Sequence, residues 1–137
     1  MGDQLTKAIT MASLTPGQSL PLLPHVLHVT YVQNTGAAFG LFKGQQLVFI
    51  VFSIIVIGWM IRELLTKPAM DAVLRWACAL LLGGAAGNLI DRLRFGYVVD
   101  FIDLRVWPVF NIGDSAITIG VSLLVLHSIL TRHTGNG

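Results

Sequence analysis

Three long stretches without charged residues occupy most of the chain after residue 43. They are residues 44–61, 76–90 and 115–131, with 18, 15 and 17 residues respectively. A helix needs about 20 mainly apolar residues to cross a lipid bilayer. The second stretch approaches that length when Leu74 and the apolar stem of Arg75 are added. The pattern therefore predicts three membrane-spanning helices, at residues 44–65, 74–91 and 114–132.

The segment before the first stretch has a different pattern. In residues 1–13, Asp3 and Lys7 have the i, i+4 spacing of a helical ion pair, and from this spacing alone we interpret them as a surface helix end. Three prolines and a glycine in Ser13–Pro24 predict an extended or turning link. His28–Val32 is rich in β-branched and aromatic residues, which predicts a strand.

A turn signal follows the predicted strand at Asn34–Gly36, and residues 37–40 are small enough for another group to approach the backbone. We expect residues 14–43 to form a small sheet on one side of the membrane. With three spans, the loop at residues 92–113 lies on that same side. Counting Lys and Arg on the two sides of the membrane does not orient the chain, because the numbers are nearly equal.

The composition supports an integral membrane protein of one domain. Of the 137 residues, 54% are hydrophobic and only 12% are charged, whereas about a quarter are charged in a soluble domain. The net charge of +2 and the scattered basic residues argue against nucleic-acid binding. The single cysteine, Cys78, excludes an intramolecular disulfide and a multi-cysteine metal site. The first residues lack the apolar core of a cleavable signal peptide.

Four of the seven acidic residues lie between Gly83 and Ala116, next to the apolar stretches: Asp91, Asp100, Asp103 and Asp114. Carboxylates near hydrocarbon are costly, which favours a functional reason for them. Asp100 and Asp114 are 14 residues apart and border the loop, so the loop can bring them together. Two close carboxyl groups share one proton, which is the arrangement of aspartic proteases. The alternatives are a solvated loop acid for Asp100 and a helix N-cap for Asp114.

Other polar residues near these acids are candidates for binding substrate or orienting a carboxylate: Asn34, Asn88, Arg92 and Asn111. Each asparagine alone is equally a turn or cap residue. We pair Asp91 with Arg92 as scaffold and interpret Asp103 as a solvated loop residue. No metal site is expected, because the four histidines lie in separate segments without metal-ligand spacing.

Five motifs carry a resemblance to a known family: DQLTK (Asp3–Lys7), QNTGAAFGLF (Gln33–Phe42), GGAAGNLIDR (Gly83–Arg92), GYVVDFID (Gly96–Asp103) and FNIGDSAI (Phe110–Ile117). In these motifs and in their order, the chain resembles bacterial lipoprotein signal peptidase, also called signal peptidase II. The resemblance implies an aspartic endopeptidase that removes signal peptides from diacylglyceryl-modified prolipoproteins, just before the lipidated cysteine. It matches Asp100 and Asp114 to the catalytic pair. The resemblance also matches six further residues to positions that line or brace the family's site: Asn34, Asn88, Arg92, Asn111, Asp3 and Lys7.

The same resemblance implies an all-α membrane protein, with a bundle of four transmembrane helices and a small extracytoplasmic β-cradle. Residues 1–137 would form one peptidase domain, with residues 1–13 as the remnant of the first helix and the cradle loop at residues 14–43. The implied enzyme needs no cofactor or metal and acts as a monomer among membrane lipids. It would be a multi-pass protein of the bacterial inner membrane, with its active site on the extracytoplasmic side.

Two alternatives from other classes remain open on the residues alone. A small transporter or channel subunit would use the acids for ions or protons, but it predicts carboxylates nearer to the middle of a helix. A structural membrane protein without activity would need no paired acids at all.

Overall fold

The structure, a computed structural model, describes residues 1–36, 45–67 and 70–134, with the side chains of residues 132–134 left aside. The expectation of closely approached small residues at 37–40 lies outside the described residues, as does the end of the 14–43 loop. In chain order the elements are α1 (Gly2–Ser13), β1 (Ser19–Leu23), β2 (Leu27–Asn34), α2 (Gln46–Thr66), α3 (Ala72–Phe95), β3 (Val98–Asp103) and α4 (Ile112–Thr134).

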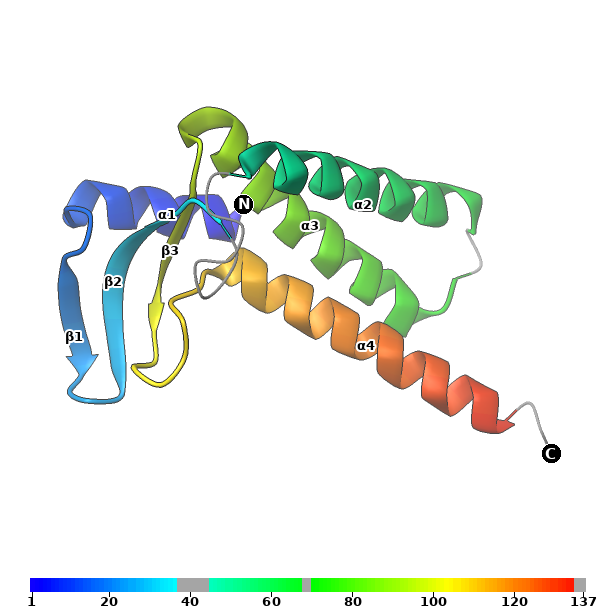
Figure 1. The fold of residues 1–137 in the computed structure, drawn as a ribbon. Coiled ribbons are helices and arrows are strands. Elements are labelled where there is room, and N and C mark those ends of the chain that lie inside the picture. The colour runs from blue at the N-terminus through cyan, green and yellow to red at the C-terminus, as the bar shows by residue number, and fades with distance from the viewer. Residues whose placement is uncertain (37–44, 68–69, 135–137) are drawn as a thin grey trace.

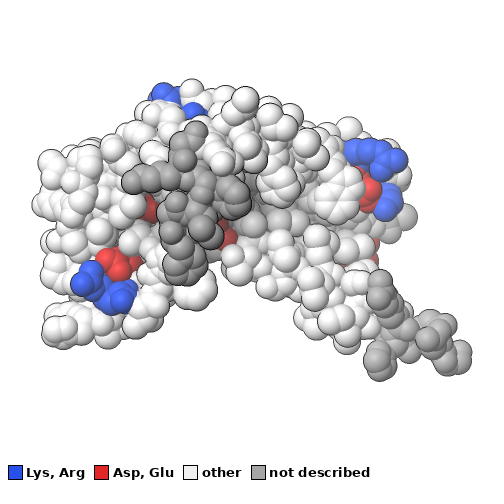
Figure 2. Space-filling view, in the orientation of Figure 1, with Lys and Arg blue, Asp and Glu red and all other residues white. Residues whose placement is uncertain are grey.

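Three of these helices are long and apolar enough to cross a membrane. Within the described residues they are α2, α3 and α4, with mean hydropathies of 2.2, 1.5 and 1.6. Their apolar side chains face outward over most of α2 and α4, as expected where the surroundings are lipid instead of water. Figure 2 shows charged side chains gathered towards the two ends of these helices, with an uncharged surface between them. The structure therefore confirms three candidate spans of a multi-pass membrane protein.

The helix boundaries differ from the predicted ones by one to four residues, and two of the differences matter for the site. Helix α3 continues to Phe95 and ends at Gly96, whose φ of 75° suits a glycine in the left-handed region. Arg92 is therefore on a helix and not in the loop. Helix α4 begins at Ile112, so Asp114 lies inside its first turn and is not its N-cap.

Small residues let α3 and α4 approach closely. A Cβ added at Gly84 would lie 2.4 Å from the carbonyl oxygen of Gly113 and 2.8 Å from Ile117 Cγ1. Further along α4, a Cβ at Gly120 would lie 2.9 Å from the carbonyl oxygen of Ala77. Such close backbone contacts are the usual basis of helix association in membranes. The contact holds the first turn of α4 beside the middle of α3.

The strands form one antiparallel sheet in the order β1-β2-β3. In Figure 1 this sheet and α1 lie together at the end of the three long helices where β3 leads into α4. The predicted strand at His28–Val32 is confirmed within the longer β2. The extended link predicted at Ser13–Pro24 contains strand β1, Ser19–Leu23, which pairs with β2 in the small sheet expected for residues 14–43. Strand β3 was missed altogether, because it lies in the segment predicted to be a loop.

The register of β2 and β3 brings polar residues together. Val32 pairs with Asp100 and Asn34 with Val98, beyond an irregularity between Val29 and Val32. Asp103, predicted to be a solvated loop residue, is instead only 5% exposed. It accepts a 2.7 Å hydrogen bond from Thr30 Oγ1 and a 3.1 Å one from Arg105 Nη1. Hydrogen bonding explains its burial, since a buried carboxylate needs donors.

Helix α1 packs against the rest of the protein through its polar face. Asp3, Lys7 and Thr10 are buried, whereas Leu5 and Ile9 are exposed. The predicted pairing of Asp3 with Lys7 is confirmed, with 2.9 Å between Nζ and Oδ2. The interpretation as a surface helix end was wrong, because both partners are buried. Buried ionic residues on a short helix point to a role in holding the adjacent site.

Candidate active site

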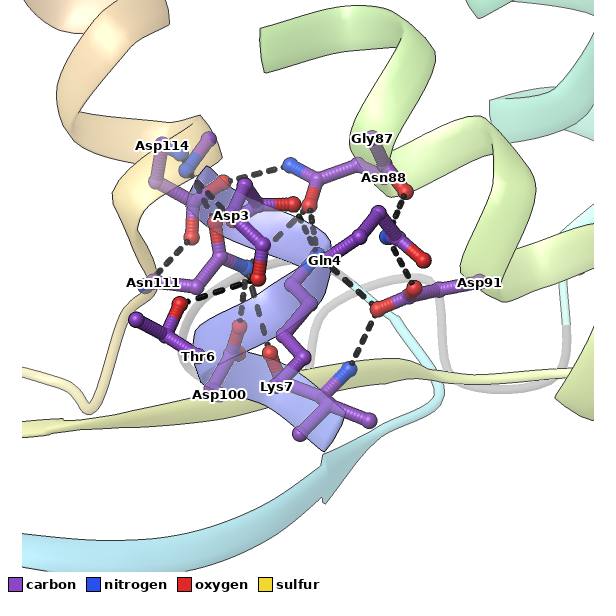
Figure 3. Close-up of polar contacts among 12 residues, drawn as sticks. Asp3, Gln4, Thr6, Lys7, Gly87, Asn88, Asp91, Asp100, Asn111 and Asp114 are labelled. Atoms are coloured by element: carbon purple, nitrogen blue, oxygen red, sulfur yellow. Dashed lines mark hydrogen bonds and ion pairs between the residues drawn. The ribbon is translucent and has the colours of Figure 1, made fainter. Parts of the chain in front are cut away.

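The two acids that sequence reasoning paired come together where β3 and α4 meet. Asp100 lies in the middle of β3 and is 1% exposed, and Asp114 lies in the first turn of α4. Asp100 Oδ2 accepts a 2.9 Å hydrogen bond from Asn34 Nδ2, and Oδ1 accepts a 2.6 Å hydrogen bond from Asn111 Nδ2. Figure 3 shows the surrounding polar residues converging from α1, α3, β3 and α4.

Asn111 caps α4 and joins the two acids. Its Oδ1 accepts from the backbone N–H of Asp114 at 2.9 Å, and its own N–H donates to Asp114 Oδ2 at 3.2 Å. This reciprocal pair is a capping box, in which the first and fourth residues satisfy each other's free amide groups. The N-cap alternative considered for Asp114 thus applies to Asn111. Asp114 is left with Oδ1 facing the site.

Asn88 reaches Asp114 from the facing helix. It lies on α3, buried, and its Nδ2 donates a 2.8 Å hydrogen bond to Asp114 Oδ1. Its Oδ1 accepts from Asn111 Nδ2 at 3.1 Å. The three predicted asparagines, Asn34, Asn88 and Asn111, therefore each donate to one of the paired carboxylates. An amide that donates to a carboxylate stabilises it without adding charge.

The environment of Asp100 favours its protonated form. Burial, followed by the charge of Asp114, raises the pKa of Asp100 to about 7, against an ordinary value of 3.8. The hydrogen bonds from Asn34 and Asn111 and the charge of Lys7 oppose this rise. The physical cause is the cost of placing a second negative charge beside the first in a poorly solvated site. One proton on the pair at neutral pH is the condition that acid–base chemistry by two carboxyl groups requires.

A second buried cluster lies directly behind Asn88. Lys7 Nζ donates to Asn88 Oδ1 at 2.9 Å and forms ion pairs at 2.9 Å with Asp3 and Asp91. Asp3 Oδ1 accepts from the backbone N–H of Gly113 at 2.8 Å. These contacts join α1 to α3 and to the first turn of α4. Asp3 and Lys7, which the sequence indicated as residues that brace the site, therefore each contact a residue next to the paired acids: Gly113 precedes Asp114, and Asn88 donates to it.

Asp91 and Gln4 belong to this cluster, although sequence reasoning assigned neither of them to it. Asp91 Oδ2 accepts from the backbone N–H of Val99 at 3.0 Å, and Oδ1 accepts from Gln4 Nε2 at 2.8 Å. The predicted pairing of Asp91 with Arg92 is replaced by its ion pair with Lys7. One signal was available, because Asp3, Gln4 and Lys7 share one face of a helix. Their partners, 80 or more residues away in the sequence, carried no local signal.

Arg92 lies on α3 beside the acids and stacks on an aromatic ring. Its guanidinium carbon is 5.1 Å from the centre of the Phe49 ring on α2. Arg92 also lines a cavity of about 210 Å³ between α2, α3 and α4, together with Asn88, Asp114 and an apolar wall. The stacking fixes the cation in a position where its remaining donors face the cavity.

Asp114 borders two cavities. The wall of the first cavity includes Phe52, Val56 and Leu81 from α2 and α3. The second, of about 420 Å³, is lined by Leu104, Trp107 and Phe110 from the loop before α4 and by residues of α4 that include Asp114. Both cavities are lined mostly by apolar side chains, and Asp114 contributes a polar group to each.

No three histidine, cysteine or acidic side chains converge into a metal-binding group in the part of the chain that the structure describes. His127, which lies on the apolar face of α4, instead pairs with Asp71 near the start of α3 at 2.5 Å. At Asp100 and Asp114, two carboxyl groups are oriented by amide donors, which suits acid–base chemistry.

Comparison with known proteins gives consistent results. A family model described as signal peptidase (SPase) II matches residues 1–130. The lipoprotein signal peptidase of Halothermothrix orenii is 45% identical over 91% of this chain and 86% of its own length. The lipoprotein signal peptidase of Moorella thermoacetica is 48% identical over 93% of this chain and 85% of its own length. A solved bacterial membrane enzyme superimposes with a TM-score of 0.90 at 35% identity, covering 99% of this chain and 85% of its own.

Proposed function

The chain belongs to the signal peptidase II family, and we propose that Asp100 and Asp114 are the catalytic pair of its reaction. The enzyme is an aspartic endopeptidase that removes signal peptides from diacylglyceryl-modified prolipoproteins, just before the lipidated cysteine. The observation that carries the catalytic assignment is Asn111, which donates to Asp100 through its side chain and to Asp114 through its backbone. Because Asp100 and Asp114 both accept hydrogen bonds from Asn111, they are kept close enough to share a proton.

We assign the shared proton to Asp100 in the resting enzyme. The raised pKa of Asp100, about 7, supports this assignment. Asp114 accepts one side-chain and one backbone N–H at the N-terminus of α4, and the partial positive charge of a helix N-terminus favours an ionised acid. Asp100 is then the acid and Asp114 the base.

The reaction follows from these two states. Water attacks the carbonyl carbon of the scissile peptide bond and passes a proton to Asp114, while Asp100 donates its proton to the carbonyl oxygen. The tetrahedral intermediate collapses when the carbon–nitrogen bond breaks. The leaving nitrogen takes the proton held by Asp114, and the carbonyl returns its proton to Asp100. All protons are accounted for, and no covalent enzyme intermediate forms.

The cavity between α2, α3 and α4 is the proposed place for the acyl chains of the substrate. Its wall of Phe49, Phe52 and Val56 is apolar, and its polar end holds Arg92 and Asp114. Arg92 would donate to carbonyl oxygens of the lipid-modified residue while its ring contact holds it in place. Acyl chains enter such a cavity sideways from the bilayer, so the substrate keeps its anchor.

The sheet, α1 and the paired acids are proposed to lie on the extracytoplasmic side of a bacterial inner membrane. Two features support this placement. The sheet and the junction of β3 and α4, which carries the acids, share one end of the long helices (Figure 1), and Arg62 and Lys67 lie near the end of α2 that leads into the short connection to α3. Although the numbers of Lys and Arg are nearly equal on the two sides, their density is higher in the short Arg62–Arg75 segment, which favours the cytoplasmic side for it. We further propose a monomer in contact with lipids, in which α1 belongs to a fourth helix of the bundle.

The transporter alternative fits the geometry less well than the peptidase. Asp100 lies in a strand and Asp114 in the first turn of a helix, so neither is in the middle of a spanning helix. An ion pathway needs such groups along its length.

The test uses the purified enzyme in detergent with a lipidated prolipoprotein. Asp100→Asn and Asp114→Asn should each reduce turnover by at least about 10³-fold, because each removes one half of the acid–base pair. Both variants should remain folded, as judged by thermal unfolding. Turnover near that of the wild type in either variant would disprove the assignment. Activity should also survive a chelator, whereas its loss on chelation and recovery with zinc would indicate a metallopeptidase.

A further inference from the structure

We propose that Lys7 is a positioning residue that sets the orientation of two amide groups, those of Asn88 and Asn111, one for each acid of the pair. The inference rests on the proposed function, since it explains how the catalytic pair is held. Lys7 itself does not contact Asp100 or Asp114 through any hydrogen bond or ion pair found among the described residues. It acts through Asn88 (Figure 3).

The first amide is oriented directly. An ammonium group only donates hydrogen bonds, so the 2.9 Å contact from Lys7 Nζ requires an oxygen at that position of Asn88. The NH₂ group of Asn88 must then point the other way, where it donates to Asp114 Oδ1 at 2.8 Å. A turned amide would place its oxygen against the carboxylate oxygen of Asp114 and its NH₂ against Lys7. Both contacts would be repulsive.

The second amide is oriented through the first. Because Asn88 Oδ1 faces Lys7, it also accepts from Asn111 Nδ2 at 3.1 Å. The same Asn111 Nδ2 donates to Asp100 Oδ1 at 2.6 Å, and Asn111 Oδ1 is left to accept from the N–H of Asp114. One ammonium group thus determines which carboxylate oxygens receive donors on both sides of the pair.

Lys7 is itself held in place. It is 1% exposed, and its ion pairs with Asp3 and Asp91 fix its side chain between α1 and α3. Both acids are held in turn by backbone N–H groups, Asp3 by Gly113 and Asp91 by Val99. If Lys7 served only to neutralise the charge of an acid, a single ion pair would be enough. The position between two acids aims its ammonium group at Asn88.

The consequence is a dependence of the reaction on pH. Without Lys7 the amide of Asn88 is free to turn its oxygen towards Asp114, which favours the protonated carboxyl group of Asp114. Asn111 stays oriented by its cap on the N–H of Asp114 but loses its acceptor at Asn88. The charged groups around the pair are Lys7 and Asp3 from α1 and Asp91 and Arg92 from α3. The side chains from α2 and β2 that line the site, such as Ser53 and Asn34, are neutral. A change of charge at position 7 must therefore be separated from a change of amide orientation.

Two variants of the full-length enzyme make this separation. Lys7→Met removes the donor and one positive charge. Asp3→Asn with Lys7→Met removes the same donor but leaves the cluster's charge unchanged, because one positive and one negative charge are lost together. The asparagine oxygen at position 3 still accepts from the backbone N–H of Gly113. A matched control is Glu63→Gln with Lys67→Met, another i, i+4 acid–lysine pair, at the far end of α2.

The readout is kcat/KM for a lipidated prolipoprotein between pH 4 and 9, together with thermal unfolding. In both Lys7 variants we expect the acidic limb of the kcat/KM profile, where activity falls with falling pH, to move to higher pH by about one unit. The value of kcat should be lowered and KM nearly unchanged. The control variant should show no movement of the limb. In an Asn88→Ala background the charge-matched variant should add no further movement of the limb, because Lys7 orients the amides through Asn88.

Each other outcome would overturn the inference. An unchanged pH profile in the charge-matched variant, with activity scaled to the folded fraction, would reduce Lys7 to a stabilising role. If the acidic limb of the pH profile moved in Lys7→Met but lay at its wild-type position in the charge-matched variant, the effect would be one of charge alone. Failure of the proposed function is distinguishable, because Asp100→Asn or Asp114→Asn would then retain turnover whatever the Lys7 variants do.

Discussion

Asn111 caps helix α4 and, from that position, donates a 2.6 Å hydrogen bond to Asp100 on the neighbouring strand. The start of the last membrane helix is therefore tied to one of the two acids. Any change that moves the first turn of α4 also moves the donor on Asp100. The site is built into the helix terminus, where free backbone N–H groups are available.

Asn111→Ser separates these two roles of the residue. Serine is as good an N-cap as asparagine, but it has no NH₂ group to donate to Asp100. We expect Asn111→Ser and Asn111→Ala both to lose most activity, with the alanine variant less stable than the serine variant by about 1 kcal/mol. Thermal unfolding in detergent and cleavage of a lipidated prolipoprotein measure the two effects. A serine variant with full turnover would show that the donor to Asp100 is dispensable.

Asp100→Asn should change how stability depends on pH. Since the pKa of Asp100 is raised to about 7 in the folded protein, the folded state holds this proton more tightly than the unfolded state. The resulting stabilisation is complete below about pH 4 and is lost as the pH rises to about 7. The slope is about 1.4 kcal/mol per pH unit. Asp100→Asn has no such proton to lose. The difference in unfolding free energy between the variant and the wild type should therefore rise in favour of the variant from about pH 4 to about pH 7 and stay constant above pH 7.

Asp103→Asn is the control of opposite sign for that experiment. Burial opposes the ionisation of Asp103, but the hydrogen bonds from Thr30 and Arg105 outweigh it and hold the pKa of Asp103 below its ordinary value. Its contribution to stability is present above the ordinary pKa and is lost as the pH falls. Relative to wild type, this variant should therefore be weakest near neutral pH. Parallel curves for the two variants would contradict the assignment of the proton to Asp100.

Gly84→Ala should force α3 and α4 apart. Its Cβ would lie 2.4 Å from the carbonyl oxygen of Gly113, next to Asp114, and backbone there has little room to move. We expect a loss of about 1–3 kcal/mol in unfolding free energy and reduced turnover. Gly83→Ala is the matched control, because nothing lies within 4 Å of its added Cβ and alanine is the better helix former. Equal behaviour of the two variants would contradict the close helix contact.

Labelling of introduced cysteines tests the proposed orientation. In a Cys78→Ser background, Ser19→Cys lies on the exposed strand β1 and Thr66→Cys at the opposite end of α2, also exposed. A membrane-impermeant maleimide added to intact cells with a permeable outer membrane should label position 19 and spare position 66. Inside-out vesicles should give the reverse pattern. Labelling of position 66 in the intact cells would place the acids on the cytoplasmic side.

The three spanning helices could be predicted from sequence because their signal is local. Each is a run of apolar residues that needs no partner to be recognised, since lipid satisfies its side chains and the helix satisfies its own backbone. The two acids also stood out, because carboxylates beside such runs are unusual. The family motifs then connected Asp100 with Asp114 and the asparagines with both.

Strand β3, the burial of Asp103 and the partners of Lys7 could not be predicted in the same way. Each depends on a residue far away in the chain: β3 on its pairing with β2, Asp103 on Thr30, and Lys7 on Asn88 and Asp91. Val98–Asp103 does carry β-branched and aromatic residues, as His28–Val32 does, but its place between two predicted spans led to its assignment to a loop.

The sequence by itself determined that this chain crosses a membrane, where its helices lie, and which two acids are paired. The tertiary structure alone decided that α1 is buried through its charged face and that Lys7 lies within hydrogen-bond distance of Asn88. The physical reason is the reach of each interaction. Hydrophobic runs act along the chain, whereas the orientation of a hydrogen-bonded amide depends on atoms that only folding brings within 3 Å of each other.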